Sequence, residues 1–140
     1  MDSQMSEFLN SFMAAWNAHD VHTVVSHYSP DYEEIDVARA QPQIGPDHVR
    51  RTMLYYLRAF PDFQVMLNDA LVNGDRAALY WTWTGTHRGT FMNIPATGHR
   101  VTVRGTSLVT LESGQIRRAL RIWDLAGLLR DLKLLPELQA

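Results

Sequence analysis

The second half of the chain constrains the fold more than any other part of the sequence. Three strand-like segments follow one another there, at residues 77–87, 100–111 and 115–123. Turn signals flank and join them: Asn73-Gly74-Asp75 stands ahead of the first, and residues 112–115 separate the last two. Residues 63–72 add a further strand before this turn, with a break expected near Asn68. The pattern predicts a long antiparallel meander.

Three amphipathic segments precede the meander and predict helices. The first carries one stripe at helical spacing: Met5, Phe8, Leu9, Phe12, Met13 and Trp16. The second follows the capping residue Asp20 and is expected to end at Pro30-Asp31. The third opens at Gly45-Pro46-Asp47, where a proline at the first helical position costs no hydrogen bond, and it stops at Pro61.

Helices followed by a meander are typical of an α+β fold. We expect a cone-shaped α+β barrel in which three N-terminal helices pack on a curved, mostly antiparallel sheet. At 140 residues the chain is expected to form a single domain, residues 1–140. A sheet of this shape closes a conical pocket, which suits a small molecule.

Composition excludes several classes of protein. The chain has no cysteine, so disulfide frameworks, thiolate zinc sites and cysteine nucleophiles are ruled out. Its single lysine, Lys133, and scattered arginines give no nucleic-acid surface. No histidine spacing suggests a metal site, and no glycine-rich phosphate loop is present. Neither a signal peptide nor an apolar run of about 18 residues occurs, so we expect a cytoplasmic protein without a membrane segment.

General acid–base chemistry remains, and it needs only one or two ionisable groups in a dry pocket. The short strand predicted at residues 32–37 places Tyr32, Glu34 and Asp36 on one face. If that face lines the pocket, desolvation makes either carboxylate a candidate proton acceptor. Alternatively the segment is an edge strand and both acids face solvent.

The last strand carries a candidate cation. Arg121 shares a face with Ala119 and Trp123, and it could stabilise an enolate or a ligand carboxylate at the pocket wall. The alternative is an arginine stacked on a surface tryptophan. Ser107, among valines, is either bonded to the backbone or a donor in the pocket.

The polar end of the strand at residues 77–87 leads into a loop at residues 88–98. His87 could act as an acid or base at the mouth of the pocket, or it could simply end the strand in solvent. The apolar loop residues Phe91, Met92 and Ile94 suggest that the loop covers something. On the same strand, Trp81 and Trp83 share a face that would suit a subunit interface.

Several of these stretches resemble the SnoaL-like polyketide cyclases of the nuclear transport factor 2-like superfamily, which also includes ketosteroid isomerase. They are residues 84–91, 94–98, 114–116 and 123–136, together with 16–20 and 28–32. The resemblance covers nearly the whole chain. It implies a cone-shaped barrel without a metal or organic cofactor, often a homodimer through the outer sheet face.

The resemblance also implies candidate site residues. The family's acid–base aspartate and a nearby histidine on the last strand are replaced here by Arg121 and Ala119. Similarity to the ketosteroid isomerases instead places the proton-shuttling aspartate at Asp36, and it puts Phe12 and Ser107 where those enzymes stabilise the oxyanion.

Three functions are compatible with this pattern. The first is a cofactor-independent cyclase or isomerase for a hydrophobic, carbonyl-bearing molecule such as a polyketide or terpenoid. In it, Asp36, assisted by Glu34, relays a proton while Arg121 and His87 stabilise the oxyanion. The expected substrate-binding residues are Phe12, Trp16, Tyr32, Phe91, Ser107 and Trp123. The second is an epoxide or lactone hydrolase, and the third is a small-molecule-binding protein without turnover.

Overall fold

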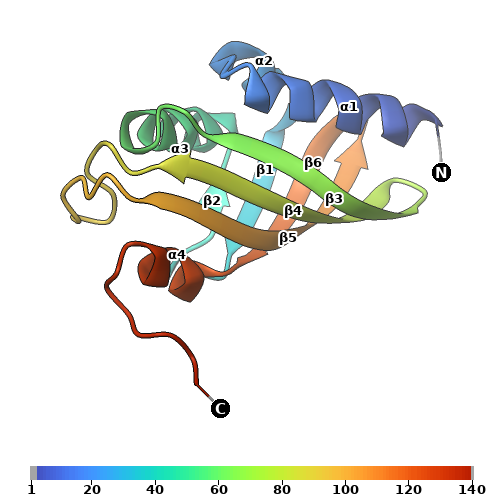
Figure 1. Cartoon of the computed structure of the whole chain (residues 1–140). Helices are drawn as coiled ribbons and strands as arrows, with labels where there is room; N and C mark the ends of the chain where they lie inside the picture. Colours follow the sequence, from blue (N-terminus) through green and yellow to red (C-terminus); the bar gives the residue numbers. More distant parts are fainter. Residues whose placement is uncertain (1–2, 140) are drawn as a thin grey trace.

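The computed structural model describes residues 3–139. Within them, the helices and strands follow one another along the chain in the order α1, α2, β1, β2, α3, β3, β4, β5, β6 and α4 (Figure 1). The helices are α1 (Ser3–Asn17), α2 (Val21–Ser26), α3 (Pro46–Ala59) and α4 (Leu125–Asp131). The strands are β1 (Tyr28–Asp36), β2 (Gln43–Ile44), β3 (Gln64–Asn73), β4 (Arg76–Thr86), β5 (Arg100–Glu112) and β6 (Gln115–Trp123).

The strands form one curved sheet in the order β2-β1-β6-β5-β4-β3. Every neighbouring pair is antiparallel except β1 and β6, which run parallel. In Figure 1 the first three helices lie across one side of this sheet, and α4 closes one end. The predicted α+β architecture is therefore confirmed.

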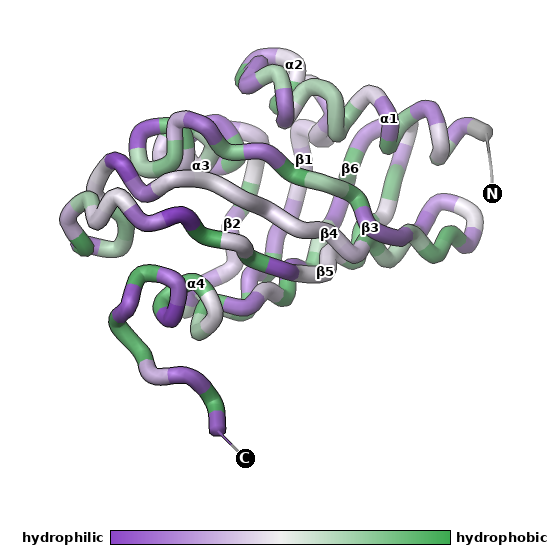
Figure 2. Tube along the Cα trace, viewed as in Figure 1, coloured by the Kyte–Doolittle hydropathy of each residue, from purple (hydrophilic) through white to green (hydrophobic). Residues whose placement is uncertain are grey.

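Local sequence signals account for most of the element ends. The Asp20 side chain accepts a hydrogen bond from the N–H of Thr23 and caps α2. Pro46 stands in the first turn of α3, directly after Gly45 at φ 84°. Ser113 and Gly114, at φ 53° and 76°, form the tight turn between β5 and β6. The apolar and polar residues that alternate along α1 are visible in Figure 2.

The second helix is shorter than predicted, because Tyr28 and Pro30 belong to β1. A proline interrupts strand pairing, since it lacks an N–H. The β1–β6 register shifts between Tyr28 and Glu33, where Pro30 lies, so the strand accommodates the missing donor in an irregular stretch. The break expected near Asn68 is present as a register shift between Leu67 and Asp69.

The sequence suggested that Trp81 and Trp83 form a subunit interface, and the structure places them elsewhere. Both side chains lie on the concave face of β4 and line a cavity rather than an outer surface. Trp83 packs against Phe60 and Phe63, and Trp81 is 9% exposed. The pleat of β4 instead turns Tyr80, which is 39% exposed, outward.

Candidate functional site

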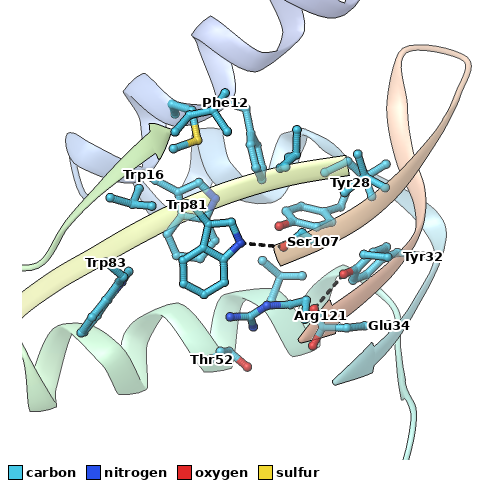
Figure 3. A pocket seen from close by; sticks show the side chains of 18 of the residues that line it. Phe12, Trp16, Tyr28, Tyr32, Glu34, Thr52, Trp81, Trp83, Ser107 and Arg121 are labelled. Carbon is cyan, nitrogen blue, oxygen red and sulfur yellow. Dashed lines mark hydrogen bonds between the residues drawn. The ribbon is translucent and has the colours of Figure 1, made fainter. Parts of the chain in front are cut away.

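A cavity of about 100 Å³ lies between the concave face of the sheet and helices α1 and α3 (Figure 3). Its walls are mainly apolar, with residues from both helices and from β3, β4, β5 and β6. They are Phe12, Met13, Trp16, Val49, Val65, Leu67, Leu79, Trp81, Trp83, Val109, Ile116 and Ala119. Its polar lining residues are Tyr28, Tyr32, Glu34, His48, Thr52, Tyr56, Ser107 and Arg121.

Strand β1 brings Tyr32 and Glu34 into this cavity. The Tyr32 hydroxyl donates to Oε1 of Glu34 at 2.7 Å, and Nε2 of His48 donates to Oε2 at 3.0 Å. Burial alone would raise the pKa of Glu34, but the His48 hydrogen bond, the charge of Arg121 and the Tyr32 hydrogen bond lower it to about 2. Glu34 is therefore an ionised carboxylate at neutral pH, even though it is only 4% exposed.

Helix α3 supplies His48, which the sequence analysis did not single out. His48 is buried, and its Nδ1 lies 3.5 Å from the hydroxyl of Thr52, a long contact. His48, Thr52 and Tyr56 follow one another at intervals of four residues, so they form a polar stripe beside the apolar stripe of α3. That spacing was the available sequence signal.

Arg121 stands beside Asp36 and also interacts electrostatically with Glu34. The parallel register pairs Asp36 with Arg121, and the guanidinium Nη1 lies 3.6 Å from Oδ2 of Asp36. The guanidinium also lies over the ring of Trp81, 5.9 Å from its centroid. Burial would lower the pKa of Arg121, but Tyr56, Glu34 and Asp36 outweigh it and raise the pKa above its ordinary value. Arg121 is a permanent, largely buried cation.

Asp36 is buried but does not line the main cavity. Its Oδ1 accepts from the indole N–H of Trp123 at 2.9 Å and from the N–H of Ala38 at 2.9 Å. The reason is the length of the strand: two residues advance about 6–7 Å, which carries Asp36 past the cavity that Glu34 faces. Asp36 borders a second, outer hollow of about 420 Å³ instead.

The other predicted binding residues divide between these two spaces. Phe12, Trp16, Tyr32 and Ser107 line the main cavity, where the Ser107 hydroxyl accepts from the indole N–H of Trp81 at 3.0 Å. Phe91 and Trp123 line the outer hollow. Phe91 is only 6% exposed, so the loop at residues 88–98 does cover an interior space. Tyr28 is a further lining residue that the sequence analysis missed, because that residue was assigned to a helix.

The position expected for His87 is wrong. His87 is fully buried beneath residues 97–99, where its Nδ1 accepts from the N–H of Thr97 at 3.2 Å and its ring stacks on Phe60. Desolvation lowers the pKa of His87, which keeps it neutral. It borders neither the cavity nor the outer hollow. Its backbone N–H donates to the carbonyl of His99 and its carbonyl accepts from the N–H of Gly98, which fixes it beside these residues.

An α+β cone with a largely apolar cavity and a buried charged cluster defines a class of small-molecule-binding domain. The chain belongs to the SnoaL-like polyketide cyclase family, whose model matches residues 6–132. The resemblance noted in the sequence is thus confirmed, and members of this family bind small-molecule substrates.

Solved structures agree with this membership. AclR from Streptomyces galilaeus, a proposed hydroxylase, superposes with a TM-score of 0.86 at 28% identity, covering 98% of this chain and 89% of AclR. TsrD from Streptomyces laurentii superposes with a TM-score of 0.85 at 26% identity, covering 96% of this chain and 99% of TsrD. IdmH from Streptomyces antibioticus, a proposed polyketide cyclase, shares the fold with a TM-score of 0.79 at 22% identity, covering 91% and 97%. No curated protein matches the sequence.

Two further observations concern metal binding and membrane-spanning helices. Across residues 3–139, no group of three or more histidine, aspartate or glutamate side chains is arranged to hold a metal ion. In the same residues, no helix is both long and apolar enough to cross a membrane.

Proposed function

We propose that this protein is a cofactor-independent cyclase or isomerase that acts by acid–base catalysis on an apolar, carbonyl-bearing small molecule of polyketide or terpenoid type. Family membership supports a small-molecule cyclase- or isomerase-type function. One observation carries the mechanism: Glu34, His48 and Arg121 line the same, mainly apolar cavity, where His48 is hydrogen-bonded to Glu34.

His48 is the proton acceptor in this proposal. When Nε2 carries the proton donated to Glu34, Nδ1 has a free electron pair, since the Thr52 contact is too long to occupy it firmly. Glu34 fixes this tautomer and stabilises the imidazolium that forms, as a carboxylate does beside a catalytic histidine. With its low pKa, Glu34 itself is a weak base.

The reaction step follows from this arrangement. His48 removes a proton from the carbon next to the substrate carbonyl, and the C–H electron pair forms the C=C bond of an enolate. The negative charge moves to the carbonyl oxygen, where Arg121 stabilises it. An isomerase returns the proton from His48 to another carbon. In a cyclase the enolate carbon attacks a second carbonyl of the same molecule, and the alkoxide formed there takes the proton from His48.

Asp36 has a different role from the one suggested by the sequence. Its contacts with Trp123, Ala38 and Arg121 hold the guanidinium in place, so we assign it as a positioning residue. Substrate binding falls to Phe12, Trp16, Tyr32 and Ser107 in the cavity, and to Phe91 and Trp123 beside it.

Proton exchange tests this function without knowledge of the natural substrate. The protein should accelerate deuterium exchange at the acidic C–H positions of 2-tetralone in deuterated buffer, followed by NMR. His48→Gln should slow that exchange by about 100-fold or more, because it removes the general base. Arg76→Gln, an exposed change at the far hairpin, should leave it unaltered.

Other outcomes would contradict the proposal. Binding of 2-tetralone to the unaltered protein without exchange would indicate a binding protein. Acceleration by the protein of the hydrolysis of indene oxide to its diol would indicate the hydrolase. Equal exchange in His48→Gln and the parent would remove His48 from the mechanism.

We also propose that two copies associate through the outer face of the sheet. Five side chains there lie opposite one another across five strands: Ile35, Leu120, Leu108, Ala78 and Leu71. Ile35, Leu108 and Leu71 are 54%, 40% and 71% exposed. A continuous apolar row of this kind is unusual on a monomer, and a two-fold axis would set one row against its copy.

Sedimentation velocity tests the dimer. The parent protein should sediment as a dimer at micromolar concentration, and Leu108→Glu should sediment as a monomer, because it places two charges in the centre of the interface. Leu138→Glu is the matched control, since Leu138 is 92% exposed near the C-terminus. A monomeric parent, or a dimeric Leu108→Glu protein, would contradict this interface.

A further inference from the structure

The outer hollow lies beside the cavity in which the proposed reaction takes place, and Phe91 and Trp123 are part of its lining. It has about four times the volume of the main cavity, at about 420 Å³ compared with about 100 Å³. His48, Thr52 and Tyr56 border both spaces, so the cavity and the hollow are neighbours along one polar stripe of α3. A ligand that reaches past this stripe would occupy both spaces.

Two arginines give this hollow its charge. Arg39 follows β1 in the turn that its N–H forms with the carbonyl of Asp36, and Arg51 lies on α3 beside Thr52. In residues 3–139, neither guanidinium has a carboxylate within 4.0 Å, and the two line the same space. Two cations facing a common space without counter-ions favour an anion in that space.

The hollow contains one carboxylate, which does not cancel this charge. Asp36 accepts two hydrogen bonds and pairs with Arg121 at 3.6 Å, so its negative charge is already compensated from the cavity side. Gln43 adds an uncharged amide to the lining. The net charge of the side chains that line the hollow is therefore positive.

Apolar side chains line the remaining wall of the hollow. Phe91 and Met92 stand in a turn closed by the Phe91–Ile94 bridge, and the Tyr55 hydroxyl accepts from the N–H of Met92 at 2.6 Å. Trp123 and Leu125 complete this wall. The space thus combines two cations with an aromatic and aliphatic surface, which suits an amphipathic ligand.

We propose that the substrate is a carboxylic acid whose carboxylate binds between Arg39 and Arg51 in the outer hollow, while its apolar, carbonyl-bearing part enters the main cavity. This inference rests on the proposed function, since it makes the cavity the place of reaction. It adds a specificity site: a free acid should be bound in preference to the corresponding ester or amide.

A matched pair of probes tests this site. 2-Naphthoate and 2-naphthamide have nearly the same shape and differ in charge, and isothermal titration calorimetry measures both. The protein should bind 2-naphthoate at least about tenfold more tightly, since hydrogen bonds from an arginine to an anion are among the strong ones. Salt should weaken the binding of 2-naphthoate only, because both arginines are solvent-exposed.

Variants connect the preference to the two arginines. Arg39→Gln/Arg51→Gln should remove the preference for 2-naphthoate and leave 2-naphthamide binding unaltered. Arg76→Gln carries the same change of residue type outside the hollow and should behave as the parent. Equal affinity for the two probes, failure of both to bind, or an equal loss in Arg76→Gln would overturn the proposal.

Failure of this inference is distinguishable from failure of the proposed function. The exchange of 2-tetralone depends on His48 and Arg121 and requires no carboxylate on the probe. Normal exchange together with equal binding of the naphthyl probes would therefore overturn the anion site alone. Selective binding of 2-naphthoate without exchange would support the anion site and overturn the catalytic role.

Discussion

Replacing Arg121 with methionine is expected to lower the free energy of unfolding by about 3–5 kcal/mol, the usual cost of removing one partner from a buried charge cluster. Arg121 is the cation next to both Glu34 and Asp36, which are 4% and 3% exposed. Methionine fills a similar volume but leaves these carboxylates buried without their guanidinium. Urea unfolding at pH 7 measures the loss.

The same variant should change the pH dependence of stability. In the folded parent protein the pKa of Glu34 is about 2, compared with 4.5 for a free glutamate. Ionised Glu34 thus stabilises the fold above pH 4.5, and this contribution is lost as the pH falls toward 2. Without Arg121 the folded pKa rises, so the contribution should be smaller and should be lost at higher pH.

Arg121→Lys is the matched control, because it keeps the positive charge but not the planar guanidinium. We expect Arg121→Lys to have a higher free energy of unfolding than Arg121→Met. Its exchange of 2-tetralone should nevertheless be slower than that of the parent protein. The opposite result is a free energy of unfolding for Arg121→Met within about 1 kcal/mol of the parent value at pH 7. The two carboxylates would then behave as hydrated surface groups, which would contradict a buried charge cluster.

Gly105→Ala is the second change with a large expected effect. Gly105 lies on β5 opposite Trp81, and an added Cβ would be 2.5 Å from Cη2 of Trp81 and 2.8 Å from Cβ of Trp123. Because Trp81 lines the cavity and its indole N–H is bonded to Ser107, the ring cannot move away without disturbing the site. We expect a loss of about 1–3 kcal/mol in unfolding free energy, as for overpacked cores.

A double variant provides the control for this prediction. Trp81→Phe removes the ring atoms that the new Cβ would meet, so Gly105→Ala should cost less in that background. Urea unfolding of the parent, both single variants and the double variant measures this coupling. Additive losses would show that Trp81 is not the obstacle, and the packing of the cavity wall would need another explanation.

The sequence was sufficient to predict most of the architecture. Turn signals at Asn73-Gly74 and Ser113-Gly114 act within a few residues, and so do the Asp20 cap and the Pro46 start of α3. Alternation along residues 32–37 placed Tyr32, Glu34 and Asp36 on one face without deciding whether it faces the interior, and all three are buried. The exception was the end of the second helix: α2 stops at Ser26 and not at Pro30, because β1 begins at Tyr28 and pairs with β6.

The membership of the site was less predictable from sequence. Glu34 and Asp36 are equivalent by alternation, yet only Glu34 faces the main cavity. His48 joins Glu34 across 14 residues of chain, and nothing within either segment signals that contact. His87 shows the opposite case: its polar neighbours suggested a pocket, but it is buried beneath residues 97–99, away from both the cavity and the outer hollow.

The sequence by itself determined most of the order of helices and strands, the side chains that share a face, and the family. The first two depend on local geometry and on the side-chain periods of helix and strand. Tertiary structure alone decided which charges meet. The curvature of the sheet and the parallel pairing of β1 with β6 bring Asp36 to Arg121, and the position of α3 brings His48 to Glu34. Distances between side chains on separate elements depend on how the whole chain packs, and periodicity within one element carries no information about them.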